Sequence, residues 1–295
     1  MPAPADLLAL TKPRIVALVA VTAAAGYALG LRALPFGVWP TTSRAAELWV
    51  LLHTMLGTAL AAGGTSALNQ LVERDVDALM RRTARRPLPA GRVTPRAAGV
   101  FACAVGALGV AELYAFVNAT TAALAAATLV VYVAAYTPLK RRTHLATLVG
   151  AVPGALPIVG GWTASGAPLD ARAAVLFAIL FLWQIPHFLA LGWLYREDYA
   201  RAGMRMLSLD DGTGATTFRQ AALNAAALLP ISLVPVALAM AGRVYFALAL
   251  ALSTGLLLLA LDGARRPTPA RARRLFLATL TYLPALLGAL VVSRP

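Results

Sequence analysis

The chain has 295 residues, of which 60% are hydrophobic and only 13% charged, with a mean hydropathy of +0.73. A soluble domain carries about 25% charged residues, so this composition excludes an ordinary soluble enzyme. The net charge of +14 would suit a nucleic-acid partner, but the positive residues lie in alternate loops between apolar runs, which is typical of cytoplasmic loops of membrane proteins. We therefore expect a membrane protein that binds no nucleic acid.

Nine apolar segments are long enough to cross a bilayer as helices, whereas a barrel would show alternating segments of about 10 residues. We expect an all-α integral membrane protein, one polytopic domain over residues 1–295, with its helices bundled around a central apolar cavity. The first segment lacks a small-residue cleavage site and is interpreted as a retained span. The expected spans are residues 14–32, 46–68, 96–114, 117–136, 145–163, 172–194, 220–240, 244–262 and 274–292.

The positive residues divide unevenly between the two sides of these spans. With the N-terminus in the cytoplasm, 21 of the 26 Lys and Arg residues lie inside, which sets the orientation under the positive-inside rule. The odd number of spans then places the C-terminus, with Arg294, on the opposite side of a bacterial-type cytoplasmic membrane. Eight of the twelve acidic residues also lie inside. Because that rule gives acids little weight, their position indicates a functional site at the cytoplasmic helix ends.

The first span begins with Thr11-Lys-Pro-Arg14, with a proline near the helix start. Arg14 is a candidate contact for a phosphate group. An arginine at this position is equally explained by a side chain that extends from the apolar region to the membrane surface.

A polar segment, Asn69 to Asp77, continues from the second span. At about 100° per residue, Asn69, Glu73 and Asp77 share one helix face, whereas Asp75 points away. Three oxygen ligands on one face suit Mg²⁺, which is held by one or two carboxylates together with waters and substrate phosphates. An alternative is a solvated helix end in which acids and arginines pair four residues apart.

Cations follow this segment and also end the fourth span. Guanidinium groups suit bidentate contact with phosphate oxygens. The same cations are also explained as topology signals of the inner face. The candidate phosphate contacts are Arg81, Arg82, Arg85 and Arg86 in the first loop and Lys140 to Arg142 in the later one.

A second polar segment, Tyr195 to Gly203, ends the sixth span. Tyr195 and Tyr199 share a face, and Asp198 lies three residues from Tyr195. Tyrosine hydroxyls can donate to phosphate oxygens and Asp198 can bind a second metal. An interfacial aromatic belt explains the same tyrosines.

The remaining reactive residues form no familiar catalytic motif. The sequence contains no Ser/His/Asp arrangement, HExxH or Walker loop. Cys103 is the only cysteine, so a disulfide within the chain is excluded. We expect Cys103 to be a small core residue. His187 lies within the sixth span, where a lone histidine is more often a packing residue than a ligand.

These motifs together resemble the UbiA-type intramembrane prenyltransferases, and among them the haem branch, the protohaem IX farnesyltransferases. The resemblance spans nearly the whole chain. The superfamily's first motif, an Asn and two acids at four-residue steps, corresponds to Asn69, Glu73 and Asp77. The haem branch is indicated by Thr11-Lys-Pro-Arg14, Tyr136-Thr-Pro-Leu-Lys-Arg-Arg-Thr143, Pro153-Gly-Ala-Leu-Pro157, Trp183-Gln-Ile-Pro-His-Phe188 and Arg196-Glu-Asp-Tyr-Ala-Arg-Ala-Gly203.

The resemblance implies that farnesyl diphosphate and haem B are converted in the bilayer to haem O and diphosphate, with Mg²⁺ as cofactor. The farnesyl group would add to the haem 2-vinyl group and water would capture the resulting cation. It implies a downstream haem A synthase or terminal oxidase assembly. The implied metal ligands are Asn69, Glu73 and Asp77, and the implied catalytic residues are these three with Lys140, Tyr195 and Asp198. The implied diphosphate contacts are Arg14, Arg81, Arg82, Arg85, Arg86, Arg141 and Tyr199, and His187 is the implied haem contact.

Three departures from the family pattern bear on the substrate. Where quinone-pathway relatives have a second Asp-x-x-x-Asp, this chain has Tyr195 and Tyr199, which argues against an aromatic-acid acceptor. Glu73 replaces a more frequent Asp, and Ala146 stands where Asn is expected. The alternatives are a UbiA-type enzyme with a phenolic or lipid acceptor and a transporter for an anionic solute. A transporter would place its site near the middle of the membrane, on broken helices.

Overall fold

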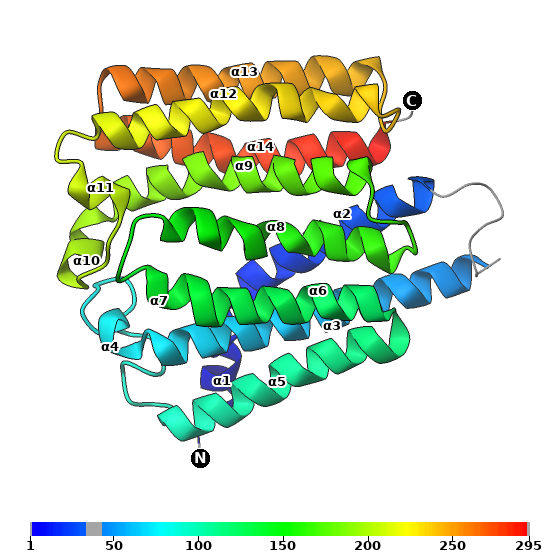
Figure 1. The fold of residues 1–295 in the computed structure, drawn as a ribbon. Helices are drawn as coiled ribbons and strands as arrows, with labels where there is room; N and C mark the ends of the chain where they lie inside the picture. The colour runs from blue at the N-terminus through cyan, green and yellow to red at the C-terminus, as the bar shows by residue number, and fades with distance from the viewer. Residues whose placement is uncertain (1, 34–42, 294–295) are drawn as a thin grey trace.

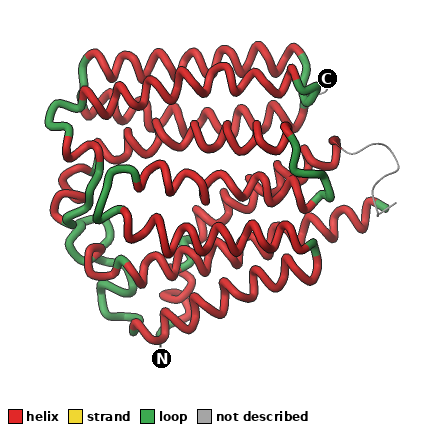
Figure 2. The backbone as a smooth tube through the Cα atoms, in the orientation of Figure 1, coloured by secondary structure: helices red, strands yellow, loops and turns green. Residues whose placement is uncertain are grey.

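The computed structural model describes residues 2–33 and 43–293, and these ranges contain helices and loops but no strand (Figures 1 and 2). Nine described helical segments are long and apolar enough to cross a membrane, which confirms the predicted all-α architecture, with every end within five residues of its predicted place. They are α2 (Pro13–Ala33), α3 (Arg44–Val72), α5 (Pro95–Phe116), α6 to α7 (Ala119–Leu139), α8 (Ala146–Ala164), α9 (Ala171–Leu194), α12 (Ala215–Ala237), α13 (Arg243–Arg265) and α14 (Pro269–Val292). Arg294 lies outside the described residues.

The spans run side by side along a common direction (Figure 1). α3, α5 and α6 form one side of the bundle, α12, α13 and α14 form the other, and α2, α8 and α9 connect them. The short helices that follow or end the spans gather at one end, which we call the site end. They are α4 (Arg74–Asp77), α7 (Thr137–Leu139), α10 (Arg196–Arg201) and α11 (Leu207–Asp210).

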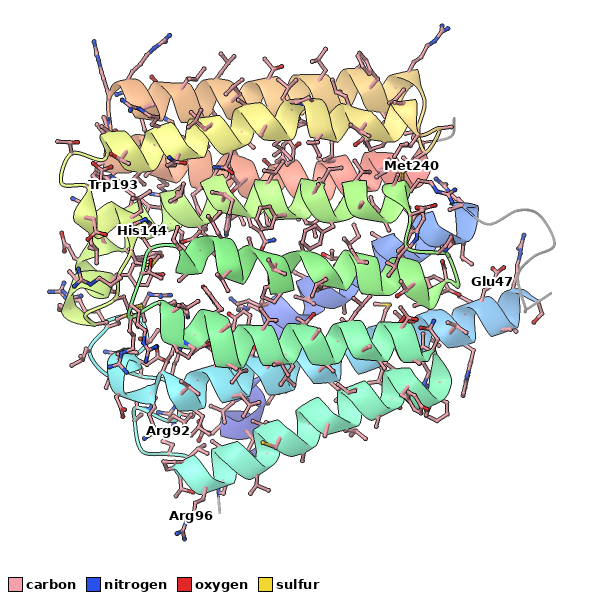
Figure 3. All side chains as sticks on the ribbon, in the orientation of Figure 1. Glu47, Arg92, Arg96, His144, Trp193 and Met240 are labelled. Atoms are coloured by element: carbon pink, nitrogen blue, oxygen red, sulfur yellow. The ribbon has the colours of Figure 1, made fainter. Side chains whose placement is uncertain are left out.

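The two ends of the bundle differ in the side chains that they carry. Arg92 and His144 lie at the site end, whereas Glu47 and Met240 lie at the opposite end (Figure 3). A backbone hydrogen bond of 2.7 Å from Arg205 N to Lys140 O ties the loop after α10 to the loop after α7. Loops that are distant in sequence therefore meet over the helix ends.

The faces of the spanning helices differ in what they contact. The largest cluster of buried apolar side chains lies among α8, α9, α12, α13 and α14, while many large hydrophobic residues elsewhere are exposed on the outside of the bundle. The core position predicted for Cys103 is wrong, because this residue of α5 is exposed. Helices that face lipid are apolar on the outside as well, so an apolar run does not reveal which face is buried.

Close approach of α2 and α8 depends on glycine. A Cβ atom at Gly161 would collide with the backbone oxygen of Ala23, and one at Gly26 would collide with the backbone oxygen of Ile158. Small residues allow helix backbones to approach in this way within membranes, where packing supplies much of the association energy. The contact sets the position of α2, which carries the first residues of the site.

Replacement of Gly161 by Ala is expected to destabilise the protein by about 1–3 kcal/mol, because a backbone atom cannot move aside as a flexible side chain can. Thermal unfolding in detergent measures the effect. Gly288→Ala on α14 is the matched control, since a Cβ atom there meets nothing within 4 Å. Equal unfolding temperatures for both variants would contradict the proposed helix contact.

Candidate active site

The predicted metal-ligand segment is not one continuous helix. α3 ends at Val72, Glu73 caps it with φ −93° and ψ 5°, and α4 begins at Arg74. The spacing of four nevertheless survives the break, because Glu73 N donates to Asn69 O at 2.9 Å and Asp77 N donates to Glu73 O at 2.8 Å. The three side chains line the same cavity as a result.

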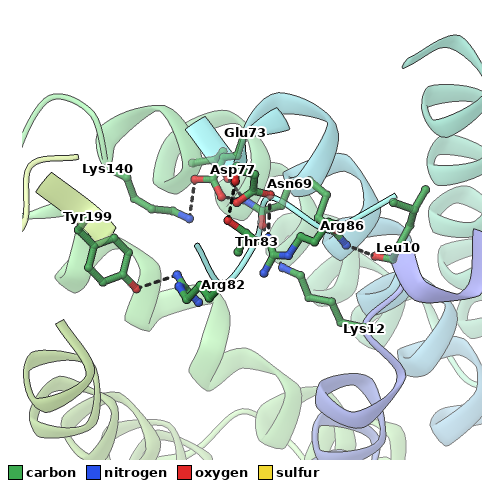
Figure 4. A network of polar contacts seen from close by, with 12 residues as sticks. Leu10, Lys12, Asn69, Glu73, Asp77, Arg82, Thr83, Arg86, Lys140 and Tyr199 are labelled. Atoms are coloured by element: carbon green, nitrogen blue, oxygen red, sulfur yellow. Dashed lines mark hydrogen bonds and ion pairs between the residues drawn. The ribbon is translucent and has the colours of Figure 1, made fainter. Parts of the chain in front are cut away.

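Each of these three side chains has a specific partner (Figure 4). Asn69 donates through Nδ2 to Glu73 Oε2 at 3.0 Å and to Thr137 Oγ1 at 3.2 Å. Glu73 Oε1 lies 2.6 Å from Lys140 Nζ, and Asp77 Oδ2 accepts from Arg86 Nη1 at 2.7 Å. Asp77 is only 1% exposed. Buried carboxylates paired with cations are costly to maintain for stability alone, which favours a functional role.

The cation that lies at the start of the first span is Lys12, just before α2 begins. Its Nζ donates to Asn69 Oδ1 at 3.1 Å, whereas Arg14 is exposed and does not line the cavity. Lys12 has a φ of 53°, a left-handed conformation that is uncommon outside glycine. Backbone strain of this kind persists where surrounding structure enforces it, often at functional sites. Sequence reasoning named Lys12 but not as a site residue.

The cavity has a volume of about 210 Å³ and combines charged and apolar walls. The charged and amide groups come from Lys12, Asn69, Glu73, Asp77, Arg82, Arg86 and Lys140. Ile15, Met80, Phe188 and Leu191 are among the apolar lining residues. We expected a central apolar cavity. The site at the helix ends is mixed in character, and a smaller apolar cavity lies deeper between the helices.

A π-helical segment, Val131–Tyr136, brings two tyrosines to this cavity. Thr137 Oγ1 donates to Tyr132 O at 2.7 Å, which helps to hold the widened turn. The Lys140 ammonium lies 4.6 Å from the centre of the Tyr136 ring. Such π-helical turns are frequent at functional sites, but a simple count of helical positions does not predict them.

The second polar segment contributes Tyr199 to the cavity. The Tyr199 hydroxyl accepts from Arg82 Nη2 at 3.1 Å, and the Arg82 guanidinium lies 5.2 Å from the Tyr199 ring centre and 5.3 Å from that of Tyr195. Tyr195 itself is 41% exposed and does not line the cavity. Asp198 pairs with Arg201 and accepts from the backbone N of Arg81. It thereby joins the two loops without lining the cavity.

The other arginines of the predicted cluster point elsewhere. Arg81 and Arg85 are exposed and do not line the cavity. Arg141 lines a separate hollow on the other side of Glu73. Among the predicted diphosphate contacts, the structure therefore brings Arg82, Arg86 and Tyr199 together at the cavity, with Lys140 beside them.

His187 lies apart from the polar cavity, against α14. Its Nδ1 is 2.8 Å from Thr279 Oγ1, which itself donates to Phe276 O at 2.6 Å. Because the threonine proton is used in that bond, Nδ1 must donate, and Nε2 keeps its lone pair. The ring stacks on Trp183 at 5.2 Å and packs near Phe276 at 4.9 Å.

The two lysines of the site have opposite pKa shifts. Burial, together with the positive charges of Arg86 and Lys140, lowers the pKa of Lys12 to about 7. Burial alone would lower the pKa of Lys140, but the adjacent Glu73 carboxylate outweighs it and raises that pKa. An anion next to Lys12 would favour its charged form. The cavity therefore has more positive charge close together than its two carboxylates balance.

The donor set fits Mg²⁺ only when a ligand completes it. Within residues 2–33 and 43–293, no group of three or more His, Cys, Asp or Glu side chains is placed to hold a metal. The cavity offers two carboxylates and one amide oxygen, all hard donors. Magnesium is usually bound by one or two carboxylates with waters and substrate phosphates. The cations around the same cavity would complement those phosphates.

Comparison with known proteins identifies the family of this chain. The UbiA prenyltransferase family matches residues 19–283. A protoheme IX farnesyltransferase of Solibacter usitatus is 44% identical over 290 residues, 98% of this chain and 99% of that protein. One of an Anaeromyxobacter species is 48% identical over 288 residues, 98% of this chain and 93% of that protein.

Solved structures share the fold at low identity. A structure of a digeranylgeranylglyceryl phosphate synthase has a TM-score of 0.79 at 14% identity, over 98% of this chain and 97% of that chain. A UbiA homologue from Archaeoglobus fulgidus bound to GPP and Mg²⁺ has a TM-score of 0.65 at 17% identity, over 97% and 100%. The bundle of the described helices therefore has the fold of these structures, and the family match over residues 19–283 makes it a prenyltransferase fold. The chain belongs to the UbiA prenyltransferase family.

Proposed function

We propose that this protein transfers the farnesyl group of farnesyl diphosphate to the 2-vinyl group of haem B, with addition of water, to give haem O and diphosphate. The observation that carries the proposal is the cavity where Asn69, Glu73 and Asp77 face four cations over apolar walls. Relatives named protoheme IX farnesyltransferase, at 41–48% identity, support the haem acceptor.

The cavity holds the groups that a metal-bound diphosphate needs. Asn69, Glu73 and Asp77 would hold Mg²⁺, which the resemblance implies. Lys140 and Arg86 contact Glu73 and Asp77 in the structure, line the same cavity and would bind the diphosphate oxygens. Lys12, Arg82 and Tyr199 line the same cavity and add donors to these oxygens. The metal supplies positive charge that stabilises the leaving diphosphate. The side chains hold that diphosphate in a fixed position, which is the electrostatic role that usually dominates such steps.

The chemistry then proceeds without a strong general base. The bond between farnesyl C1 and the diphosphate oxygen breaks, and the π electrons of the vinyl group form the new carbon–carbon bond. The cation left beside the porphyrin ring is captured by water, which loses a proton and leaves a hydroxyl group. Ile15, Met80, Phe188 and Leu191 line the cavity and limit the access of water to the allylic cation.

The site end is proposed to face the cytoplasm, with the N-terminus inside and the C-terminus outside a bacterial-type cytoplasmic membrane. The excess of positive residues in the loops at this end supports the orientation. Haem O made at this face would pass to a haem A synthase or to terminal oxidase assembly.

His187 is proposed to contact haem B through Nε2, as an axial ligand or a packing contact of the porphyrin. The hydrogen bond between Nδ1 and Thr279 holds the ring and leaves the lone pair of Nε2 for a ligand, as second-shell partners of metal-bound histidines do.

Replacement of His187 by Ala is expected to raise KM for haem B by about tenfold or more, since loss of even an outer partner of a metal site costs about that factor, and to leave KM for farnesyl diphosphate unchanged. Steady-state rates with each substrate varied in turn measure both constants. His144→Ala is the control, because that histidine is also near the site end but is half exposed. An unchanged haem KM would reduce His187 to a packing residue.

Expression in cells that lack this activity tests the proposed function. We expect the extracted haems to include haem O, identified by the mass of haem B plus one farnesyl and one hydroxyl group, only when the intact chain is present. Accumulation of a prenylated phenol or lipid with unmodified haem B would instead support the alternative acceptor within the family.

A further inference from the structure

A second, smaller cavity of about 40 Å³ lies deeper in the bundle, among α2, α3, α5, α6 and α8. On three helices, a residue that lines the polar cavity is followed one turn deeper by a residue that lines the small one: Ile15 and Val19 on α2, Asn69 and Thr65 on α3, and Tyr132 and Thr128 at the end of α6. The two cavities therefore lie in line on the same faces of these helices.

The small cavity is apolar despite the threonines around it. Thr65 Oγ1 donates to Ala61 O at 2.7 Å and Thr128 Oγ1 donates to Leu124 O at 2.7 Å. Thr121 Oγ1 bonds Thr163 Oγ1 at 2.9 Å. Three of the four threonines that line the cavity therefore have their hydroxyl groups engaged, and the other nine lining residues are apolar. An uncharged hydrocarbon is the ligand that such walls accept.

The distance between the two cavities matches the length of a particular hydrocarbon. From Asn69 to Thr58, the deepest lining residue of α3, the helix rises about 17 Å at 1.5 Å per residue. A farnesyl main chain of twelve carbons, with bonds of about 1.5 Å, extends to about 14 Å. The two lengths agree to within about 3 Å, roughly half a helical turn, so a chain of three units that starts near Asn69 ends in the small cavity. A fourth isoprene unit would need about one more helical turn.

Leu113 closes the deep end. It is fully buried and lines the small cavity. It also fills the space beside Gly57, where an added Cβ atom would lie 2.6 Å from Leu113 Cγ. The cavity of about 40 Å³ is larger than a single water needs and has room for a small branched group, such as the isopropylidene group at the end of a prenyl chain.

We propose that the small cavity binds the last isoprene unit of the prenyl donor, and that Leu113 and Ala125 limit the donor to three units. Ala125 of α6 lines the cavity with a small side chain, and Leu113 of α5 forms its floor. The inference rests on the proposed function, because it assigns the tail of the donor whose diphosphate lies at Asn69, Glu73 and Asp77.

Donor-length selectivity of purified variants tests the inference, with geranyl, farnesyl and geranylgeranyl diphosphate and haem B as substrates. Ala125→Leu fills the space of the last unit and is expected to lower kcat/KM for farnesyl relative to geranyl diphosphate at least about tenfold, since even one misfit methylene changes selectivity by about that factor. Ala127→Leu is the matched control on the same helix, because Ala127 is exposed and does not line the cavity.

Leu113→Ala opens the floor and is expected to raise kcat/KM for geranylgeranyl relative to farnesyl diphosphate at least about tenfold. A gain in activity with the longer donor cannot arise from misfolding. Leu113→Ala therefore still tests the inference if Ala125→Leu folds poorly. Unchanged ratios in both variants would overturn the inference.

Binding of the three diphosphates with Mg²⁺, measured without haem, separates this inference from the proposed function. If no donor yields prenylated haem in the wild-type protein, the function is wrong. In that case the relative affinities of the variants for the three donors still test whether Leu113 and Ala125 limit donor length. Unchanged relative affinities would contradict that role.

Discussion

Replacement of Asp77 by Asn is expected to lower the rate of prenyl transfer at least about 10²–10³-fold, the loss seen when one electrostatic group is removed from a reacting site. Asp77 is 1% exposed and its Oδ2 accepts from Arg86 at 2.7 Å. The neutral amide keeps the shape of the side chain but removes the charge that a metal-bound diphosphate requires. Product formation with Mg²⁺, haem B and farnesyl diphosphate measures the loss.

Asp75→Asn is the matched control for this change. Asp75 lies two residues away on the same short helix, but its side chain is 70% exposed and 3.5 Å from Arg74. It lines no part of the cavity. We expect this variant to retain wild-type activity. Full activity of a folded Asp77→Asn protein, or equal loss in both variants, would contradict the metal-site proposal.

Replacement of Lys12 by Gln is expected to lower kcat by about tenfold or more and to weaken binding of farnesyl diphosphate, because one of the cations beside Asn69 is lost. The amide can still donate a hydrogen bond to Asn69, so the effect reports charge more than local structure. Kinetics with varied donor and direct binding of inorganic diphosphate with Mg²⁺ measure it.

Arg14→Gln is the control variant for this prediction. Sequence reasoning chose Arg14, but that residue is exposed, whereas Lys12 lines the cavity. We expect Arg14→Gln to retain donor binding. A larger loss in Arg14→Gln than in Lys12→Gln would show that the structure assigns the wrong cation.

The fold was largely predictable because the bilayer constrains it. Helices must be long and apolar to span the membrane, so hydropathy alone located nine spans to within five residues. The outward face of each span was not predictable, as Cys103 shows. Lipid and protein interior are both apolar, and hydropathy does not distinguish between them.

The candidate site was predictable where residues are near in sequence. Asn69, Glu73 and Asp77 meet at one cavity although the helix breaks at Glu73, because the spacing of four is preserved by backbone hydrogen bonds. Contacts between segments that are distant in sequence were less predictable. The left-handed backbone at Lys12 and the π-helical turn that presents Tyr132 both depend on packing of several helices.

The central claim is tested most directly by the purified protein supplied with farnesyl diphosphate, haem B and Mg²⁺. We predict haem O, with the mass of haem B plus one farnesyl group and one hydroxyl group, and an equal amount of diphosphate. Release of diphosphate with farnesol as the only product and haem B unchanged would contradict the account.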